Sequence, residues 1–330
     1  MSECQLDRIL VPLDGSQFSE DALSFAMTLV RPTTQLTLLH VIPKPRPVHD
    51  LHGRHVAVID EGRDRLHRHA LDELHRAVDH YRLAAKGADV QVSVADGDPA
   101  NEILRTAAHL RSGLIVIAAE GCGANGQFGL GSVADRVARA STVPVLVVRN
   151  RSLGTRGDPS VIRRIVVPLD GSDRAMAGVA VAEDLAKRLD APILLLSVVD
   201  EAGFELPMQV PGVGHDDGLY REISALADLD AQCTLDRAGA RLMRHKIVLH
   251  SMLLIGPAAS TIMHATVPGD VIIMTSRGRG SDYRWPIGSV AEKLIASGPI
   301  PVVLVPTGRE PEILAPSVAE FFQWDPIDAR

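Results

Sequence analysis

The chain has 330 residues, enough for two domains of about 150 residues that each bury a core of their own. Its residues are 46% hydrophobic but only 3% aromatic, so the cores must be built from Val, Ile, Leu and Ala. The formal net charge of −7 argues against a nucleic-acid partner, because binding phosphates requires a basic face.

The sequence favours neither a membrane partner nor export. No apolar run reaches the roughly 18 residues of a membrane span, and the polar start Met1–Arg8 does not resemble a signal peptide. The cysteines Cys4, Cys122 and Cys233 lie far apart and suggest neither a disulfide framework nor a thiolate metal site. We therefore expect a cytoplasmic protein without an intrinsic metal.

In the first half of the chain, apolar runs alternate with helical patterns. The runs predict strands at Ile9–Leu13, Leu36–Ile42, Val90–Val94, Leu114–Ala118 and Val145–Val148. Helices are predicted between them at Ser19–Leu29, Asp60–Ala85, Pro99–Leu110 and Ser132–Ala140. The buried stripe of the second helix is predicted to hold Leu66, Ala70, Leu74, Ala77 and Tyr81. Near-continuous apolar strands separated by helices are typical of a parallel sheet that is covered on both faces.

The second half repeats this alternation. Its predicted strands are Ile165–Leu169, Ile193–Val199, Ile247–Leu254, Val271–Thr275 and Val302–Val305. Its predicted helices are Arg174–Leu189, Leu219–His245, Ala258–Thr266 and Ser289–Ala296. We therefore expect domains over residues 1–150 and 164–308, a linker over 151–163 and a C-terminal tail over 309–330. The tail has no counterpart in the first half, and its aromatic residues Phe321, Phe322 and Trp324 favour docking on another surface.

The two halves are copies of one module. Arg8-Ile9-Leu10-Val11-Pro12-Leu13-Asp14-Gly15-Ser16 returns as Arg164-Ile165-Val166-Val167-Pro168-Leu169-Asp170-Gly171-Ser172, with one position in nine changed. Gly131-Ser132-Val133-Ala134-Asp135-Arg136 returns as Gly288-Ser289-Val290-Ala291-Glu292-Lys293. A repeat distance of 156 to 157 residues indicates a duplicated domain, because solenoid repeats run at roughly 20–50 residues.

Three features gather where open parallel sheets bind ligands, at the carboxyl ends of the strands. Asp14 and Asp170 end the first strands, and either cap the following helix or contact a ligand. The fourth strands end in a turn that carries Gly121 or Gly278. Ten positions later, Gly131-Ser132 and Gly288-Ser289 open the last helices, where free N–H groups and the helix dipole favour an anion. The serine hydroxyl either caps its own helix or donates to that anion.

This pattern resembles the universal stress protein family in its tandem form, over about Arg8–Arg149 and Arg164–Pro306. The nucleotide-binding branch of that family has a Gly-x2-Gly-x9-Gly-Ser/Thr phosphate loop. Here Gly-x9-Gly-Ser is intact in both halves, whereas Ala118 and Thr275 replace the first glycine. A turn requiring positive φ would strain Thr275 in particular. The resemblance implies an α/β fold of two doubly wound, five-stranded parallel sheets of the adenine nucleotide α-hydrolase-like type, each in the order 3-2-1-4-5.

The resemblance also implies an ATP site in each half, with or without Mg²⁺. Asp14 and Asp170 would bind the ribose, and main-chain groups of Val41 and Val198 would meet the adenine. The remaining predicted binding residues are Pro12, Gly121, Gly131, Ser132 and Val133 in the first half, and Pro168, Gly278, Gly288, Ser289 and Val290 in the second. Arg279 is added from the comparison of the two halves, as a phosphate contact of the second.

The two sites are predicted to be unequal. Between Ser112 and Asp135 the first half has no Lys or Arg, and Glu120 precedes the loop glycine. The matching stretch of the second half contains Arg277, Arg279 and Arg284, which either bind phosphate or remain solvated. We expect the second half to bind ATP more tightly, although strain at Thr275 would oppose this by about 1 kcal/mol.

Histidines are concentrated between His40 and His80. The spacing of His49, His52 and His55 could suit a metal, but the segment Pro43–Gly53 has no regular pattern that would fix their geometry. On the next helix, the apolar stripe leaves the histidines on other faces: His67, His69, His75 and His80. A solvated histidine-rich surface is therefore the better interpretation.

Several enzyme classes lack their motifs. The sequence has no Gly-x4-Gly-Lys-Ser/Thr loop, no Gly-x-Gly-x2-Gly after the first strand and no Gly-x-Ser-x-Gly elbow. We therefore expect a stress-response protein that holds ATP as a ligand for conformation or partner choice, with no catalytic residue. The alternatives are a slow ATP-hydrolysing or adenylate-transferring enzyme, and a scaffold that binds no nucleotide.

The last strands of the two halves, Val145–Val148 and Val302–Val305, read as apolar sheet edges, which are prone to associate. We expect the halves to pack as a pseudo-two-fold pair through them, resembling the family's homodimer. Two chains are then expected to form a further homodimer, with help from the aromatic tail.

Overall fold

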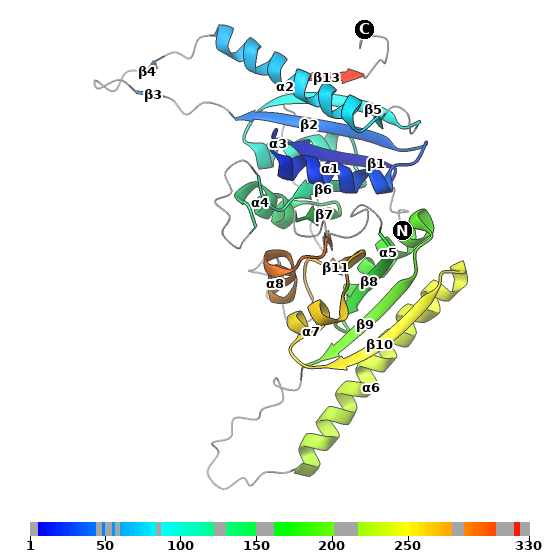
Figure 1. Ribbon diagram of the computed structural model, residues 1–330. Coiled ribbons are helices and arrows are strands. Elements are labelled where there is room, and N and C mark those ends of the chain that lie inside the picture. The colour runs from blue at the N-terminus through cyan, green and yellow to red at the C-terminus, as the bar shows by residue number, and fades with distance from the viewer. Residues whose placement is uncertain are drawn as a thin grey trace. The chain divides into compact units, whose positions relative to one another are not determined.

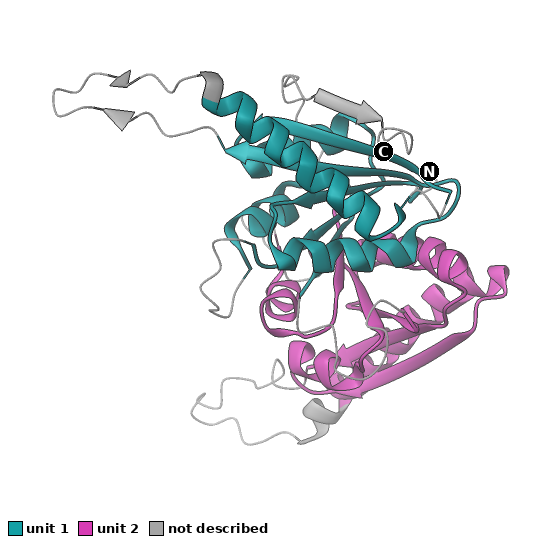
Figure 2. Cartoon of the chain, turned by 45° about the horizontal axis from the view of Figure 1, so that its top comes forward, with its two compact units in different colours: residues 1–150, 310–330 teal, residues 151–309 magenta. Residues whose placement is uncertain are grey.

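The computed structural model describes residues 6–43, 48–49, 55–56, 60–83, 87–121, 130–149, 162–200, 217–278, 287–307 and 320–323 (Figure 1). The chain forms two compact units, residues 1–150 with 310–330 and residues 151–309 (Figure 2). How the two units pack against each other stays a prediction.

The first unit is a doubly wound α/β domain. Its central strands are β1 (Arg8–Leu13), β2 (Gln35–Pro43), β5 (Asp89–Gly97), β6 (Leu114–Ala118) and β7 (Val145–Val148). They pair in parallel in the order β5-β2-β1-β6-β7, which confirms the predicted order 3-2-1-4-5. Helices α1 (Gln17–Leu29) and α2 (Asp60–His80) cover one face, and α3 (Pro99–His109) and α4 (Ser132–Ala140) cover the other (Figure 1).

The tail adds a strand that the sequence pattern does not predict. Residues Glu320–Gln323 form β13, which pairs antiparallel with the outer edge of β5, so that Glu320 lies opposite Val94 and Gln323 opposite Gln91. The five predicted strands of this unit are all parallel, and the tail adds a sixth, antiparallel strand that the prediction did not include. The tail completes the sheet at an edge whose main-chain groups would otherwise lack strand partners.

The segment between β2 and α2 contains regular structure that was not expected there. Strands β3 (Val48–His49) and β4 (His55–Val56) form a short antiparallel ladder in which His49 lies opposite His55. Two residues per strand are too few for hydrophobic periodicity to appear in the sequence. His52 lies outside the described residues.

The second unit repeats the architecture. Its strands are β8 (Arg164–Leu169), β9 (Ile193–Val199), β10 (Leu249–Ile255), β11 (Asp270–Thr275) and β12 (Val302–Val305), in the parallel order β10-β9-β8-β11-β12. Helices α5 (Ala175–Leu189) and α6 (Asp217–Leu242) contact one face, and α7 (Ala258–Ala265) and α8 (Ser289–Ser297) the other. A single turn of 3-10 helix, Met243–His245, extends α6.

The cores are aliphatic, as the composition predicts. Phe25 is the single aromatic side chain among the buried hydrophobic residues of the described part of the chain. On α2, Ala70, Leu74 and Ala77 are buried as expected, but Leu66 is 54% exposed and its assignment to the buried stripe is wrong.

An ion pair fastens β8 to the start of β11 in the second unit. Arg164 donates from Nε to Oδ1 of Asp270 at 2.9 Å and from Nη2 to Oδ2 at 2.6 Å, and the Asp270 side chain is 1% exposed. The first unit has Gly113 at the matching position, and Arg8 donates instead to the main-chain oxygen of Leu110 at 3.2 Å.

We predict that Arg164→Ala lowers the free energy of unfolding of the second unit by about 3 kcal/mol, because it leaves a buried carboxylate unpaired. The matched variant Arg8→Ala should cost about 1 kcal/mol, since it removes one hydrogen bond to a carbonyl. Denaturant unfolding followed in both variants measures the two losses. Equal losses would show that the ion pair contributes nothing beyond an ordinary hydrogen bond.

Candidate functional site

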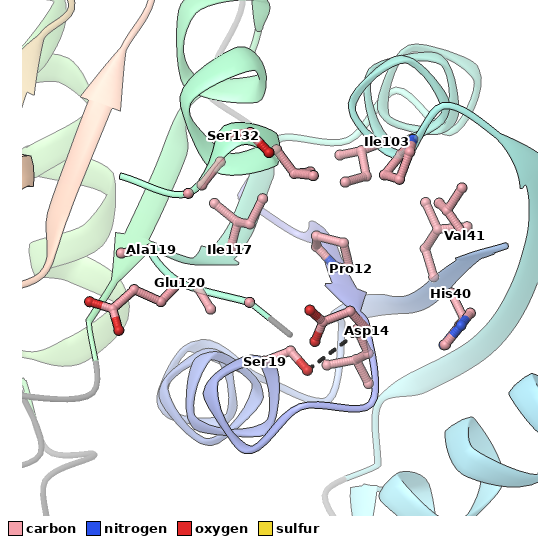
Figure 3. Close-up of a pocket in the computed structure, with 18 of the residues that line it drawn as sticks. Pro12, Asp14, Ser19, His40, Val41, Ile103, Ile117, Ala119, Glu120 and Ser132 are labelled. Atoms are coloured by element: carbon pink, nitrogen blue, oxygen red, sulfur yellow. Dashed lines mark hydrogen bonds between the residues drawn. The ribbon is translucent and has the colours of Figure 1, made fainter. Parts of the chain in front are cut away.

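A cavity of about 470 Å³ opens at the carboxyl ends of β1, β2 and β6 in the first unit (Figure 3). It is lined by seven of the residues that the sequence pattern identifies: Pro12, Asp14, Val41, Gly121, Gly131, Ser132 and Val133. Sequence reasoning missed the apolar wall formed by Leu39, Ile103 and Ile117. These side chains look like ordinary core residues in the sequence, because their periodicity reports the buried face and not a cavity within it.

Asp14 lies at the turn between β1 and α1, and its carboxylate shapes that turn. Oδ1 accepts hydrogen bonds from the Ser16 N–H at 3.0 Å and the Ser16 hydroxyl at 2.5 Å, while Gly15 adopts a φ of +76°. The N-cap of α1 is Ser16, whose hydroxyl accepts from the Ser19 N–H at 3.3 Å. Asp14 therefore organises the capping turn without being the cap, and its carboxylate lines the cavity (Figure 3).

Asp170 repeats this arrangement in the second unit. Its Oδ1 accepts from the Ser172 N–H at 3.0 Å and the Ser172 hydroxyl at 2.7 Å, and Gly171 has a φ of +80°. The neighbouring strand β9 carries Val198 one residue beyond Ser197, which lies opposite Leu169. Pro168, Asp170 and Val198 thus reach the same edge of the second sheet.

The loop after the fourth strand closes on each aspartate. A Cβ added to Gly121 would lie 2.7 Å from Oδ2 of Asp14, and one added to Gly278 would lie closer still to Oδ2 of Asp170. Both distances are shorter than real Cβ contacts, so the absence of a side chain at these two positions leaves room for the carboxylate. The glycines are explained by this close approach and not by a positive φ.

The expected strain at Thr275 is not found. Ala118 and Thr275 end β6 and β11, and neither is among the described residues with positive φ. Thr275 is buried, and its hydroxyl donates to the main-chain oxygen of Arg277 at 2.8 Å. The first glycine of the family motif is therefore replaced without backbone strain in either unit, and the penalty assigned to Thr275 is wrong.

The N-terminus of α4 faces the cavity without a side-chain cap. Gly131 is the N-cap residue, and its N–H donates to the main-chain oxygen of Ala119 at 2.7 Å. Because Gly131 is the N-cap, the hydroxyl of Ser132, the first helical residue, does not cap the helix. Ser132 is also exposed. The N–H groups of the first turn and the helix dipole favour an anion here, by about 0.3–1 kcal/mol for the dipole.

The second unit has the same helix start. Gly288 is the N-cap of α8 and donates to the main-chain oxygen of Ser276 at 2.8 Å, while Ser289 and Val290 open the helix. Arg277 precedes Gly278 and is partly exposed. Arg279 and Arg284 lie outside the described residues, so their proposed contacts with phosphate stay predictions.

Glu120 in the first unit is paired with a cation. Arg149, at the end of β7, donates from Nη1 to Oε1 of Glu120 at 2.9 Å, and its side chain is 8% exposed. The equivalent positions in the second unit hold Arg277 and Pro306. The acid that the sequence places beside the loop glycine therefore carries its own counter-ion from a neighbouring strand.

His40 lies between this cavity and a second one of about 290 Å³ that reaches α2. Its Nδ1 is buried without a hydrogen-bond partner, 3.9 Å from Oε2 of Glu73. Burial lowers the pKa of His40, and the carboxylates of Glu73 and Asp14 oppose that shift. In the sequence His40 is one of many histidines, but it directly precedes Val41 at the strand end.

The histidines of α2 differ in exposure: His69 and His80 are exposed, whereas His67 and His75 are partly buried. His67 contacts Oδ2 of Asp96 at 2.9 Å and its side chain is 19% exposed, so the prediction of a solvated face is wrong for this residue. Across the described ranges, no group of three or more His, Cys, Asp and Glu side chains has the geometry to hold a metal ion. The helices found in those ranges are also too short or too polar to cross a bilayer.

The duplicated sheet, the aspartate after the first strand and the glycine-led helix start define a tandem α/β domain protein, with a cavity at the strand ends of its first unit. The sequence profile of the universal stress protein family matches residues 5–149 and 162–306, and the chain belongs to that family.

Relatives support this assignment at both the domain and the chain level. The universal stress protein YxiE of Bacillus subtilis is 32% identical over 159 residues, covering 43% of this chain and 99% of the relative. A universal stress protein of Mycolicibacterium smegmatis is 23% identical over 303 residues, covering 90% of this chain and 96% of its own. The crystal structure of a universal stress protein from Archaeoglobus fulgidus shares the fold, with a TM-score of 0.61, 21% identity and coverage of 92% of this chain and 98% of that one.

We predict that alanine is not tolerated at the loop glycines. Gly278→Ala must displace the Asp170 carboxylate, because its Cβ would overlap Oδ2 of that side chain. The expected loss of stability is about 1–3 kcal/mol for the second unit. Gly288→Ala is the matched control, since its Cβ would lie 3.7 Å from the Ser276 oxygen, an ordinary contact. Thermal unfolding of the two variants measures the difference, and a neutral Gly278→Ala would contradict the proposed close approach.

We also predict that His40 makes the first unit sensitive to acid. Because the folded pKa lies below the unfolded value of about 6.5, the neutral imidazole favours folding, and this stability is lost as the pH falls below the unfolded pKa toward the folded one. The melting temperature of His40→Gln should therefore fall less between pH 7.5 and pH 5.5 than the melting temperature of the wild type does. Ser197→Ala, at the equivalent position of the second unit, should show the same fall in melting temperature as the wild type. If the melting temperatures of His40→Gln and the wild type fall in parallel with pH, His40 does not cause the acid sensitivity.

Proposed function

We propose that the chain binds ATP at the strand ends of each unit and that the bound nucleotide serves as a ligand for conformation or partner choice. The observation that carries this proposal is the cavity of the first unit, where a carboxylate, an apolar wall and an uncapped helix N-terminus face one space. Its volume of about 470 Å³ lies within the range of pockets for ligands of this size.

Successive parts of the cavity lining suit the base, the ribose and the phosphates of a nucleotide. The apolar wall of Leu39, Ile103 and Ile117 would accommodate the flat base, with the main chain of Val41 beside it. The Asp14 carboxylate would accept hydrogen bonds from ribose hydroxyls. At the far end, the first turn of α4 and the Ser132 hydroxyl would donate to phosphate oxygens.

The titratable groups of the cavity favour nucleotide binding over nucleotide hydrolysis. Among the described residues that line the cavity, they are Asp14, His40 and Glu120. Asp14 accepts two hydrogen bonds from the turn, and Glu120 is engaged by Arg149. A general base needs a position close to its proton and a pKa suited to the task, and neither carboxylate is arranged as an activated base. ATP hydrolysis is therefore the minor alternative, and phosphate release during incubation with ATP measures it.

In the second unit, the same proposal relies on Asp170, the α8 N-terminus and the arginines of the loop. Thr275 has no positive φ, so the backbone strain that was expected to weaken ATP binding in the second unit is absent. A charge-assisted hydrogen bond from one guanidinium to phosphate would contribute about 1.5–3 kcal/mol when desolvated. We therefore propose that the second unit holds ATP more tightly than the first.

Mass spectrometry of freshly purified, denatured protein tests whether adenine nucleotide co-purifies, and isothermal titration then compares Asp14→Ala with Asp170→Ala. Loss of the ribose contacts should lower the ATP affinity of the affected site by about 10- to 100-fold. Asp170→Ala should therefore remove the tighter of the two ATP sites. Asp173→Ala is the control, because that exposed side chain pairs with Arg237 at 2.9 Å near the same turn. If neither aspartate variant changes ATP binding, the proposal fails; if only Asp14→Ala removes the tighter site, the order of affinities is reversed.

A further inference from the structure

The outer strand of the second unit, β10, has an open edge. In the part of the chain that the structure describes, β9 is the one strand that pairs with β10, along the whole length from Leu249 to Ile255. The main-chain groups on the other side of β10 therefore have no strand partner there. Such an edge is a template for an added strand.

Three apolar side chains around this edge are exposed, beside the exposed polar residues His250 and Ser251. Met252 is 42% exposed and Ile255 57%, and Val248 just before the strand is 62% exposed. We call these three residues the β10 edge patch. The strand Leu-His-Ser-Met-Leu-Leu-Ile contains no Asp, Glu, Lys, Arg or Pro. Edge strands that stay unpaired usually carry such residues, which discourage pairing, and β10 has none of them.

The equivalent edge of the first unit is treated differently. Strand β5 occupies the position of β10 in the repeated domain, and β13 covers its outer side in an antiparallel ladder. Most of β5 is buried, whereas three consecutive residues of β10, from His250 to Met252, are exposed. The repeated fold thus accepts an antiparallel strand at this edge, but the chain has one tail for two equivalent edges.

We propose that a second copy of this chain occupies the β10 edge, through its own β10 in antiparallel orientation. A two-fold axis beside Met252 makes the contact self-complementary, as isologous dimers require. In that register Leu249 lies opposite Ile255 of the second copy, and Met252 lies opposite its own counterpart. The absence of Asp, Glu, Lys and Arg from the strand means that no fixed like charges face each other across the ladder.

Antiparallel pairing over seven residues satisfies the main-chain groups of the open edge and covers the β10 edge patch. The occupant is a second copy and not the tail, because β13 already pairs with β5 in the same chain. The proposal does not depend on nucleotide binding, since it uses neither cavity nor helix N-terminus.

Sedimentation equilibrium of the full chain over a range of concentrations tests the proposal. The wild type should show a monomer–dimer equilibrium, and Ile255→Lys and Met252→Lys should each weaken it at least about 10-fold, because a lysine on the edge opposes pairing. Leu66→Lys is the matched control: this leucine is 54% exposed in the other unit and should leave the dissociation constant unchanged. A wild type that stays monomeric at 100 µM, or a dimer unaffected by both lysines, would overturn the proposal.

Cross-linking tests the register without a charged substitution. In a chain with Cys4, Cys122 and Cys233 replaced by serine, Met252→Cys should form a covalent dimer when oxidised with diamide, since directly opposed Cβ atoms lie about 4.5–5.5 Å apart. Leu66→Cys should stay monomeric. Removal of residues 310–330 should leave the cross-link intact; if the dimer disappears with the tail, the association belongs to β13 and the proposed strand pair is wrong.

Discussion

One main-chain hydrogen bond sets the geometry of each site. The N–H of the N-cap glycine donates to the carbonyl just beyond the fourth strand, over 2.7 Å from Gly131 to Ala119 and over 2.8 Å from Gly288 to Ser276. It ties the start of the last helix to the end of the sheet, beside the glycine that lies against the aspartate. Glycine is needed at Gly121 because the carboxylate of Asp14 occupies the space of a Cβ. The recurrence of this bond in both units explains why the motif survives without its first glycine.

Within that shared frame, the two units have diverged in charge. The first pairs Glu120 with Arg149, so the loop beside its helix start is internally neutralised. The second has Arg277 in place of the acid and Pro306 in place of the arginine. Both changes together remove one acid and move the positive charge from the strand to the loop. Duplication thus preserved the main-chain architecture of the site while altering the side chains that would set its selectivity.

Much of this organisation can be predicted from the sequence, because local patterns report it. The repeat gives the two units, and the run Leu114–Ala118 is bounded by turn residues that fix its limits. Longer-range features escape such patterns. The exposure of Leu66 depends on which parts of the chain pack against α2, and the Glu120–Arg149 pair depends on the parallel pairing of β6 with β7. The strand Glu320–Gln323 has too little periodicity to be distinguished from a polar tail.

The pairing of β13 with β5 also determines when the first sheet can be completed during synthesis of the chain. On the ribosome, the chain is made from its N-terminus, and about 220 residues separate the end of β5 at Gly97 from the start of β13 at Glu320. At typical synthesis rates of about 5–20 residues per second, the outer edge of the first sheet stays open for roughly 10–45 s. During that interval the whole second unit is synthesised. The first unit is thus the earliest to acquire its core and the last to complete its sheet, so a nascent chain passes through a stage in which both sheets present an open edge.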